Sequence, residues 1–158
     1  MRREAKKPVE PASRLSPHAS PTCGLCSHVG GALLYRGAAL RIVLVDDADY
    51  PGFCRVIWNA HVREMTDLAP AARARLMRAV FATEAAVRTL CAPDKINLAS
   101  LGNAVPHLHW HVIPRHADDA HFPHPVWAAR QRPSIAARAT HARSLRAALT
   151  AALARAVT

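Results

Sequence analysis

The stretch His107-Leu108-His109-Trp110-His111-Val112-Ile113 decides both the fold and the chemistry that we expect of this chain. Its histidines alternate with apolar residues, which is the two-residue period of a β-strand. On a strand the three histidines point to one face, with neighbours about 6–7 Å apart, and the apolar residues between them point to the other face, where they can be buried. Imidazole exchanges protons or phosphoryl groups, or holds a metal, near neutral pH. Packing alone explains three such side chains poorly, so the stretch predicts a functional site.

This pattern resembles the signature of the histidine-triad (HIT) superfamily, His-φ-His-φ-His-φ-φ with φ apolar, and it matches at every signature position. The resemblance covers about residues 23–127. It implies a five-stranded antiparallel sheet with one long helix packed on it.

The order of expected elements along the chain fits that fold. Apolar runs separated by Gly, Pro and Asp predict strands at residues 32–36, 40–45, 53–59, 95–100 and 108–115. An amphipathic pattern predicts a helix over residues 71–90 that begins beside Pro70 without a polar N-cap, and an Ala-rich helix follows from Ser134. This order indicates an α+β fold with an antiparallel sheet and an added C-terminal helix. We therefore divide the chain into a disordered basic leader at 1–22, a HIT domain at 23–127 and a C-terminal helical extension at 128–158.

Composition narrows the class of protein. The chain has 158 residues, of which 51% are hydrophobic and 20% charged, as expected for one globular domain. Apolar runs stay well short of the ~20 residues that a membrane helix needs, and the N-terminus has no apolar segment typical of a secretory signal. We expect a cytoplasmic protein.

The net charge of +10 lies mainly at the two ends of the chain. Residues 1–22 carry five basic against two acidic side chains, and residues 128–158 carry six arginines and no acid. A basic groove within the domain is therefore not indicated, and nucleic acid is not an expected partner beyond weak contacts with the tails.

A Cys-x-x-Cys pair, Cys23 and Cys26, precedes the first expected strand. Such a pair in a cytosolic chain is either a redox pair or half of a metal site, and the turn expected at Ser27–Gly31 favours the metal. The HIT resemblance supplies the partners: zinc-containing bacterial members join the pair to a histidine after the third strand, here His61, and to the first triad histidine, here His107. Four such ligands would close a structural zinc site.

The same resemblance assigns the other two triad histidines to catalysis. It implies that His109 is the nucleophile, which attacks an α-phosphate and forms a covalent nucleotidyl intermediate that water then cleaves. It implies that His111 hydrogen-bonds the α-phosphate or the bridging oxygen and stabilises developing charge. This chemistry needs no metal.

Nucleotide contacts follow from the resemblance with two departures from the family pattern. Gly102 matches the glycine of the phosphate-binding loop, but Asn103 stands where Gln is usual and Ala104 stands where Ser or Thr is usual. Asn97 aligns with an amide that contacts the phosphate or leaving group, and Asp46 with the ribose-binding acid, in a register that can slip by one. Capping of backbone groups is an equal alternative for both asparagines.

The loop at residues 118–127 is rich in histidine and proline. We expect His116, His121 and His124 to face solvent, with a role in specificity as the alternative. Phe122 and Trp127 are candidates for a wall near the base or for a dimer contact.

Three functions fit these features. The leading hypothesis is a hydrolase or nucleotidyl transferase acting at the α-phosphate of a purine nucleotide derivative: a dinucleoside polyphosphate such as Ap4A, a nucleoside phosphoramidate or an acyl-adenylate. The alternatives are a nucleotide-binding regulatory module with little turnover, and a hydrolase with zinc on the three triad histidines, which leaves Cys23 and Cys26 without partners. The resemblance also implies a homodimer.

Overall fold

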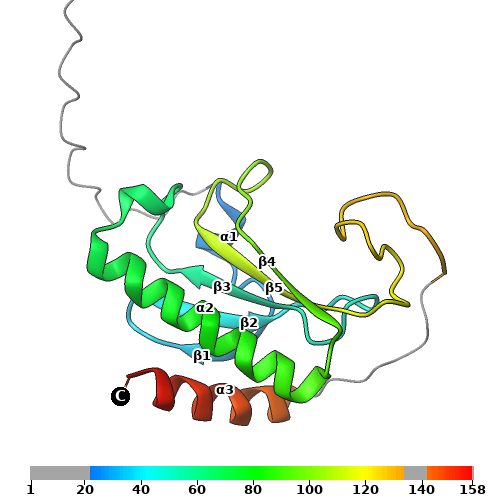
Figure 1. Ribbon diagram of the computed structural model, residues 1–158. Helices are drawn as coiled ribbons and strands as arrows, with labels where there is room; N and C mark the ends of the chain where they lie inside the picture. The colour runs from blue at the N-terminus through cyan, green and yellow to red at the C-terminus, as the bar shows by residue number, and fades with distance from the viewer. Residues whose placement is uncertain (1–21, 134–141, 158) are drawn as a thin grey trace, which may run out of the picture.

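A five-stranded antiparallel sheet forms the centre of the molecule in the computed structural model, which describes residues 22–133 and 142–157 (Figure 1). The strand order is β1-β2-β3-β5-β4, so β5 lies between β3 and the edge strand β4. The strands are β1 (Ala32–Arg36), β2 (Leu40–Leu44), β3 (Cys54–Trp58), β4 (Lys95–Ala99) and β5 (His109–Arg115). Each lies within about one residue of its predicted range, and the α+β fold is confirmed.

Within the described residues, four helical segments accompany the sheet: α1 (Gly24–Ser27), the 3-10 turn η1 (Met65–Asp67), α2 (Pro70–Cys91) and α3 (Ala142–Val157). As expected, α2 begins at Pro70, and its N-cap Ala69 makes no side-chain capping bond. The predicted leader and the predicted Ser134 cap lie outside the described residues. No helix of the described ranges is both long and apolar enough to cross a membrane.

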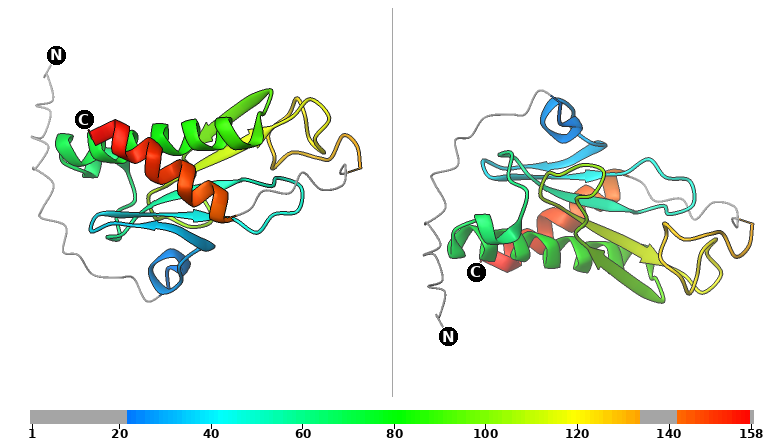
Figure 2. Two further views of the ribbon diagram at one scale, coloured as in Figure 1. Left: turned by 90° about the horizontal axis from the view of Figure 1, so that it is seen from below. Right: turned by 90° about the horizontal axis from the view of Figure 1, so that it is seen from above.

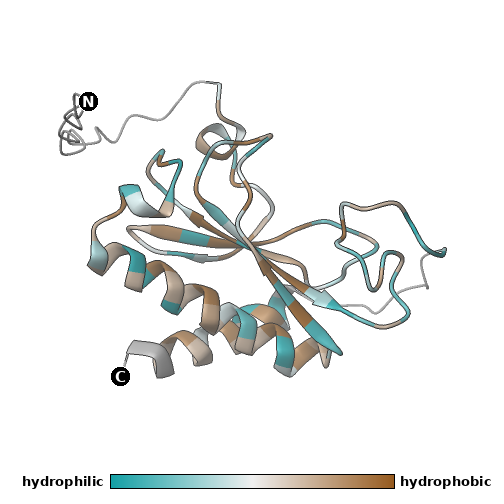
Figure 3. Cartoon of the chain, turned by 45° about the horizontal axis from the view of Figure 1, so that its top comes forward, coloured by the Kyte–Doolittle hydropathy of each residue, from teal (hydrophilic) through white to brown (hydrophobic). Residues whose placement is uncertain are grey.

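The two long helices cover one face of the sheet, as Figure 2 shows. Strand residues on the face toward the helices, such as Ile42, Val56 and Val112, form the main core together with residues of α2 and α3. The neighbouring strand residues Val43 and Ile57 point the opposite way and pack with Cys23 and Leu25 of the α1 segment. Figure 3 shows how apolar and polar residues are distributed along the strands and α2. The face of the sheet away from α2 and α3 is therefore free to carry polar side chains.

The Cys-x-x-Cys pair lies in a short helical segment that the sequence did not indicate. Gly24–Ser27 form one helical turn, α1, and residues 28–31, within the turn predicted at Ser27–Gly31, belong to no helix or strand. The carbonyl of Cys23 accepts hydrogen bonds from the backbone N–H groups of Cys26 and Ser27 and, at 3.1 Å, from the Ser27 hydroxyl. This turn brings both cysteine side chains to the same side.

Strand register places the triad on the free face. In the antiparallel pairings His111 lies opposite Arg55 of β3 and opposite Ala99 of β4, and His109 lies opposite Ile57. The residues between the histidines behave as predicted: Leu108 and Val112 are buried in the core, and Trp110 packs against it.

Candidate active site and metal centre

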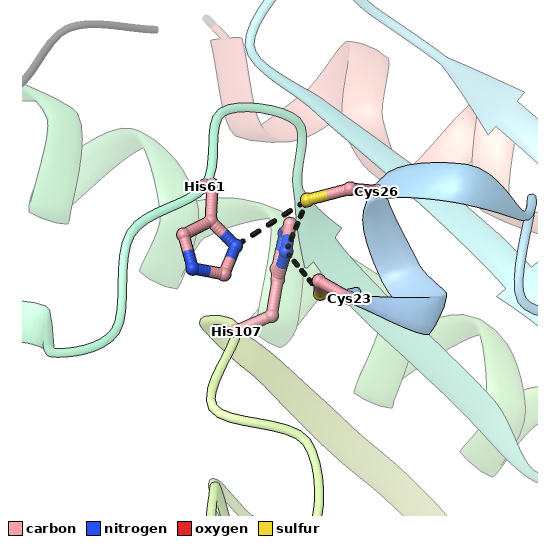
Figure 4. A group of neighbouring side chains, drawn as sticks. All are labelled: Cys23, Cys26, His61 and His107. Atoms are coloured by element: carbon pink, nitrogen blue, oxygen red, sulfur yellow. Dashed lines mark hydrogen bonds between the residues drawn. The ribbon is translucent and has the colours of Figure 1, made fainter. Parts of the chain in front are cut away.

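Four side chains from three separate segments meet beside α1 (Figure 4). The ligand atoms of Cys23, Cys26, His61 and His107 all lie within 4.8 Å of one another. The structure thus brings together the four residues of the predicted metal site.

The spacing of these atoms fits a tetrahedral metal. Nδ1 of His107 is 3.5 Å from Sγ of Cys23 and 3.4 Å from Sγ of Cys26, and Nδ1 of His61 is 3.3 Å from Sγ of Cys26. Tetrahedral zinc, with Zn–S near 2.3 Å and Zn–N near 2.05 Å, separates its sulfur and nitrogen ligands by about 3.5 Å. The donor set and its geometry therefore suit a bound metal of this kind.

Neighbouring groups hold these ligands in place. His107 is 1% exposed, and its Nε2–H donates to the Trp58 carbonyl at 2.6 Å, which directs Nδ1 toward the cysteines. Burial lowers the pKa of His107, against the opposing effect of that hydrogen bond, and favours the neutral ring that a metal ligand requires.

Arg41 attaches the α1 segment to the sheet. Its buried guanidinium on β2 donates to the carbonyls of Leu25 at 2.6 Å, Val29 at 3.0 Å and His28 at 3.3 Å. Burial and the charge of Arg36 lower the pKa of Arg41, whereas the two cysteines act to raise it.

His109 is held as a neutral imidazole with a defined tautomer. Its Nδ1 lies 2.6 Å from the carbonyl of His107, and since a carbonyl only accepts, Nδ1 carries the proton. Nε2 is then left with its lone pair, as a nucleophile requires. Burial lowers the pKa of His109, the hydrogen bond to His107 acts to raise it, and the charge of Arg55 adds to the lowering.

His111 lies next to His109, with ring centroids 4.8 Å apart. Burial first, then the charges of His109 and Arg55, lower the pKa of His111 to about 4. At neutral pH this ring is therefore uncharged, and hydrogen bonding is the interaction that it can offer a ligand. Its Nδ1 is buried and has no partner among the described residues.

A pocket of about 310 Å³ opens over these two histidines, within the range of small-molecule sites. Its lining includes three of the predicted phosphate-loop residues, Gly102, Asn103 and Ala104. Among the described residues, the atoms nearest to a Cβ added at Gly102 would be those of Pro106 and Val105, at 3.8 and 3.9 Å, so the described fold has room for a side chain there.

Two predicted nucleotide contacts do not line this pocket. The side-chain amide oxygen of Asn97, Oδ1, instead accepts a 2.6 Å hydrogen bond from Arg115. Asp46 is exposed. The charge of its neighbour Asp47 acts to raise the pKa of Arg55, which lines the pocket.

Sequence analysis missed a polar network at the far end of β5. Arg115 donates to both carboxylate oxygens of Asp119, at 2.6 and 3.0 Å, and Asp119 also accepts from the backbone N–H groups of His121 and Phe122. His121 is buried and hydrogen-bonded to the Tyr50 hydroxyl, so the prediction that it faces solvent is wrong. The reason is long-range: Tyr50 belongs to a loop 71 residues earlier. This network fixes the loop that carries Trp127, whose ring meets His111 edge-on at 5.3 Å.

The chain belongs to the HIT domain family, whose match covers residues 30–118. A search of curated proteins found no match. The family assignment places the chain in a superfamily of nucleotide-binding proteins and nucleotide hydrolases.

Solved structures agree with this assignment. A histidine triad protein from Bradyrhizobium japonicum is 28% identical, with a TM-score of 0.65, over 79% of this chain and 92% of that one. A histidine triad protein from Marinobacter aquaeolei VT8 is 27% identical, with a TM-score of 0.63, over 80% and 91% of the two chains. A third, from Sinorhizobium meliloti 1021, is 25% identical, with a TM-score of 0.63, over 78% and 90%.

The Arg115–Asp119 pair yields a stability prediction. Asp119→Asn leaves Arg115 buried without its counter-ion and should lower the free energy of unfolding by about 3 kcal/mol at pH 7. Burial acts to raise the pKa of Asp119, but hydrogen bonds from Arg115 and from backbone N–H groups outweigh it and lower this pKa from 3.8 to about 2. The carboxylate therefore stabilises the fold above pH 4, and this contribution, about 2 kcal/mol, is lost as the pH falls toward 2.

Urea denaturation at pH 7, 4 and 3 measures this effect. The difference between wild type and Asp119→Asn should shrink as the pH falls, while the exposed control Asp46→Asn should match wild type throughout. A difference that does not change with pH would contradict the prediction.

Proposed function

We propose that this protein is a nucleotide hydrolase or nucleotidyl transferase that acts at the α-phosphate of a purine nucleotide derivative through a covalent His109 intermediate. The observation that carries the proposal is the 2.6 Å hydrogen bond from His109 Nδ1–H to the His107 carbonyl, in a ring that lines the pocket. That bond leaves Nε2 as the free nucleophilic nitrogen. Substrates of this class are dinucleoside polyphosphates, nucleoside phosphoramidates and acyl-adenylates.

In the proposed reaction Nε2 of His109 attacks the α-phosphorus. The N–P bond forms as the bond from phosphorus to the leaving group breaks, and the leaving group departs with the electron pair. Water then attacks the nucleotidyl-histidine, restores the free imidazole and releases the nucleoside monophosphate. His111, neutral at pH 7, donates a hydrogen bond to an oxygen on which charge develops. The loop with Gly102 and Asn103 lines the same pocket, and its backbone N–H groups would hold the phosphate.

We further propose that Cys23, Cys26, His61 and His107 bind one structural zinc ion. Two thiolates and two imidazoles are a common structural zinc set, and four protein ligands leave no position for a reactive water. Bound zinc would stabilise the attachment of the α1 segment to the sheet. We also propose that the protein is cytoplasmic, because a zinc site of this kind requires reduced thiols and the cytoplasm keeps thiols reduced.

The two alternative functions are less well supported. Zinc on the three triad histidines is disfavoured because His107 directs Nδ1 to the cysteines and Nε2 to the Trp58 carbonyl, away from His109. A regulatory module with little turnover would bind AMP equally well, so only a trapped intermediate distinguishes it from an enzyme.

His109→Ala and His109→Asn test the mechanism. Both should bind AMP within about tenfold of wild type, because the loop and His111 remain, while kcat falls by several orders of magnitude. His111→Ala removes one donor and should lower kcat about a hundredfold. Activity is measured on adenosine phosphoramidates, their guanosine analogues and dinucleoside polyphosphates.

Acid quenching of wild type with substrate labelled at the α-phosphate should leave label on histidine. Turnover by His109→Ala at the wild-type rate would exclude the mechanism. AMP binding without turnover of any substrate on the panel would instead favour the regulatory module.

Cys23→Ser and His61→Ala test the metal site. Each should lower the zinc content below one ion per chain and lower the Tm, because a ligand of a closed site is lost. Cys91→Ser, a thiol outside the cluster, and His109→Ala should both keep one zinc per chain in elemental analysis. Full zinc retention in the double variant Cys23→Ser/Cys26→Ser would rule out this site.

We also propose a homodimer, supported by exposed apolar side chains. Phe81 of α2 is 55% exposed and Trp127 is 54% exposed, and β4 is an edge strand. Light scattering should report twice the mass of the chain at micromolar concentration, and Phe81→Glu should weaken association. A wild-type monomer under these conditions would contradict the proposal.

A further inference from the structure

Arg55 is the cationic side chain in the lining of the pocket over the triad. It lies on β3 directly opposite His111, and the same pocket is lined by Arg55, His109 and His111. The rest of β3 is Cys, Val, Ile and Trp, so this guanidinium is the polar exception in a central strand. Its charge acts on both catalytic histidines, since it lowers the pKa of each.

This guanidinium has few partners within the described part of the chain. Its Nε is buried and makes no hydrogen bond there, and NH1 reaches the Gly30 carbonyl only at 3.5 Å. Arg115 and Arg130 form ion pairs with Asp119 and Asp49, whereas the described residues give Arg55 none. Burial lowers the pKa of Arg55, and the charge of Asp47, which forms no ion pair with it, acts to raise this pKa.

A guanidinium half-buried in this way is costly without a counter-ion. Arg41, on the neighbouring strand β2, satisfies its donors with backbone carbonyls and the Asn59 side chain. Arg55 instead packs over the Phe53 ring, 5.5 Å from its centroid, and that ring lies 5.4 Å from His111. The aromatic contact holds the guanidinium in the pocket wall and leaves its donors for a ligand.

We propose that Arg55 binds the phosphoryl group that His109 attacks. Its guanidinium supplies the positive charge of the pocket and donates hydrogen bonds to the non-bridging oxygens. This inference rests on the proposed function. A guanidinium presents paired N–H donors that match two phosphate oxygens, and charge-assisted bonds of this kind are among the strongest in proteins. Arg55 would also supply a hydrogen-bond donor to the phosphate, which Ala104 cannot supply because its side chain has no hydroxyl group.

The role of Arg55 in the reaction is electrostatic. As the His109 N–P bond forms and the leaving-group bond breaks, the non-bridging oxygens stay within reach of the guanidinium in both the reactant and the intermediate. Arg55 gives up no proton, because it remains charged throughout. Its contribution is to offset the negative charge of the phosphoryl group while the neighbouring histidine rings are neutral.

The test compares AMP with adenosine, which lacks the phosphate, in wild type, Arg55→Met, Arg55→Lys and the exposed control Arg88→Met. Arg55→Met should weaken AMP binding by about thirtyfold or more and leave adenosine binding within about twofold. It should lower kcat about a hundredfold. Arg55→Lys should recover part of both losses, and Arg88→Met should match wild type. Zinc content and Tm confirm that each variant is folded, and Arg55→Gln replaces Arg55→Met if the latter is not.

The binding measurements separate this inference from the proposed function. If His109→Ala keeps full activity while Arg55→Met loses AMP but not adenosine affinity, the covalent mechanism fails and the phosphate role of Arg55 stands. If AMP affinity is unchanged in folded Arg55→Met, or if adenosine affinity falls as much as AMP affinity, the inference is overturned. The second result would place the guanidinium against the nucleoside.

Discussion

The register of β5 between β3 and β4 is the constraint on which the rest of the site depends. A shift of one residue would turn every histidine of the triad into the apolar core and every apolar partner out of it. Burial of Leu108 and Val112 against the α2 layer opposes such a shift. The same pairing brings Arg55 opposite His111, so packing on one face determines the chemistry of the other.

Burial also determines the charges in the site. The three triad histidines are all at most 7% exposed, and burial is the largest cause of the lowered pKa of each. Neutral imidazoles suit both a metal ligand and a nucleophile, but they cannot offset the charge of a phosphate. A site of this kind needs its positive charge from a residue that stays protonated when half-buried, and arginine is that residue.

Much of this architecture could be predicted from the sequence, because the relevant signals are local. Period-two alternation identified β5, Pro70 marked the start of α2, and the Cys-x-x-Cys spacing identified half of the candidate metal site. The remainder depends on contacts between distant segments. The burial of His121 requires Tyr50, the engagement of Asn97 requires Arg115, and the position of Arg55 follows only from strand register. A lone arginine in an apolar strand was the available signal for the last of these.

His107 contributes to the candidate metal centre and to the candidate active site with different parts of one residue. Its imidazole lies beside the cysteines, while its main-chain carbonyl accepts a hydrogen bond from Nδ1–H of His109. Every substitution at this position changes the first part and keeps the second, since all amino acids share the carbonyl. A saturation scan of codon 107 would therefore change the candidate metal centre, the packing of the ring and its hydrogen bond to Trp58, and would leave the carbonyl in place. The hydrogen bond that this carbonyl accepts from His109 would be tested only through backbone chemistry, such as an ester in place of the amide that follows residue 107.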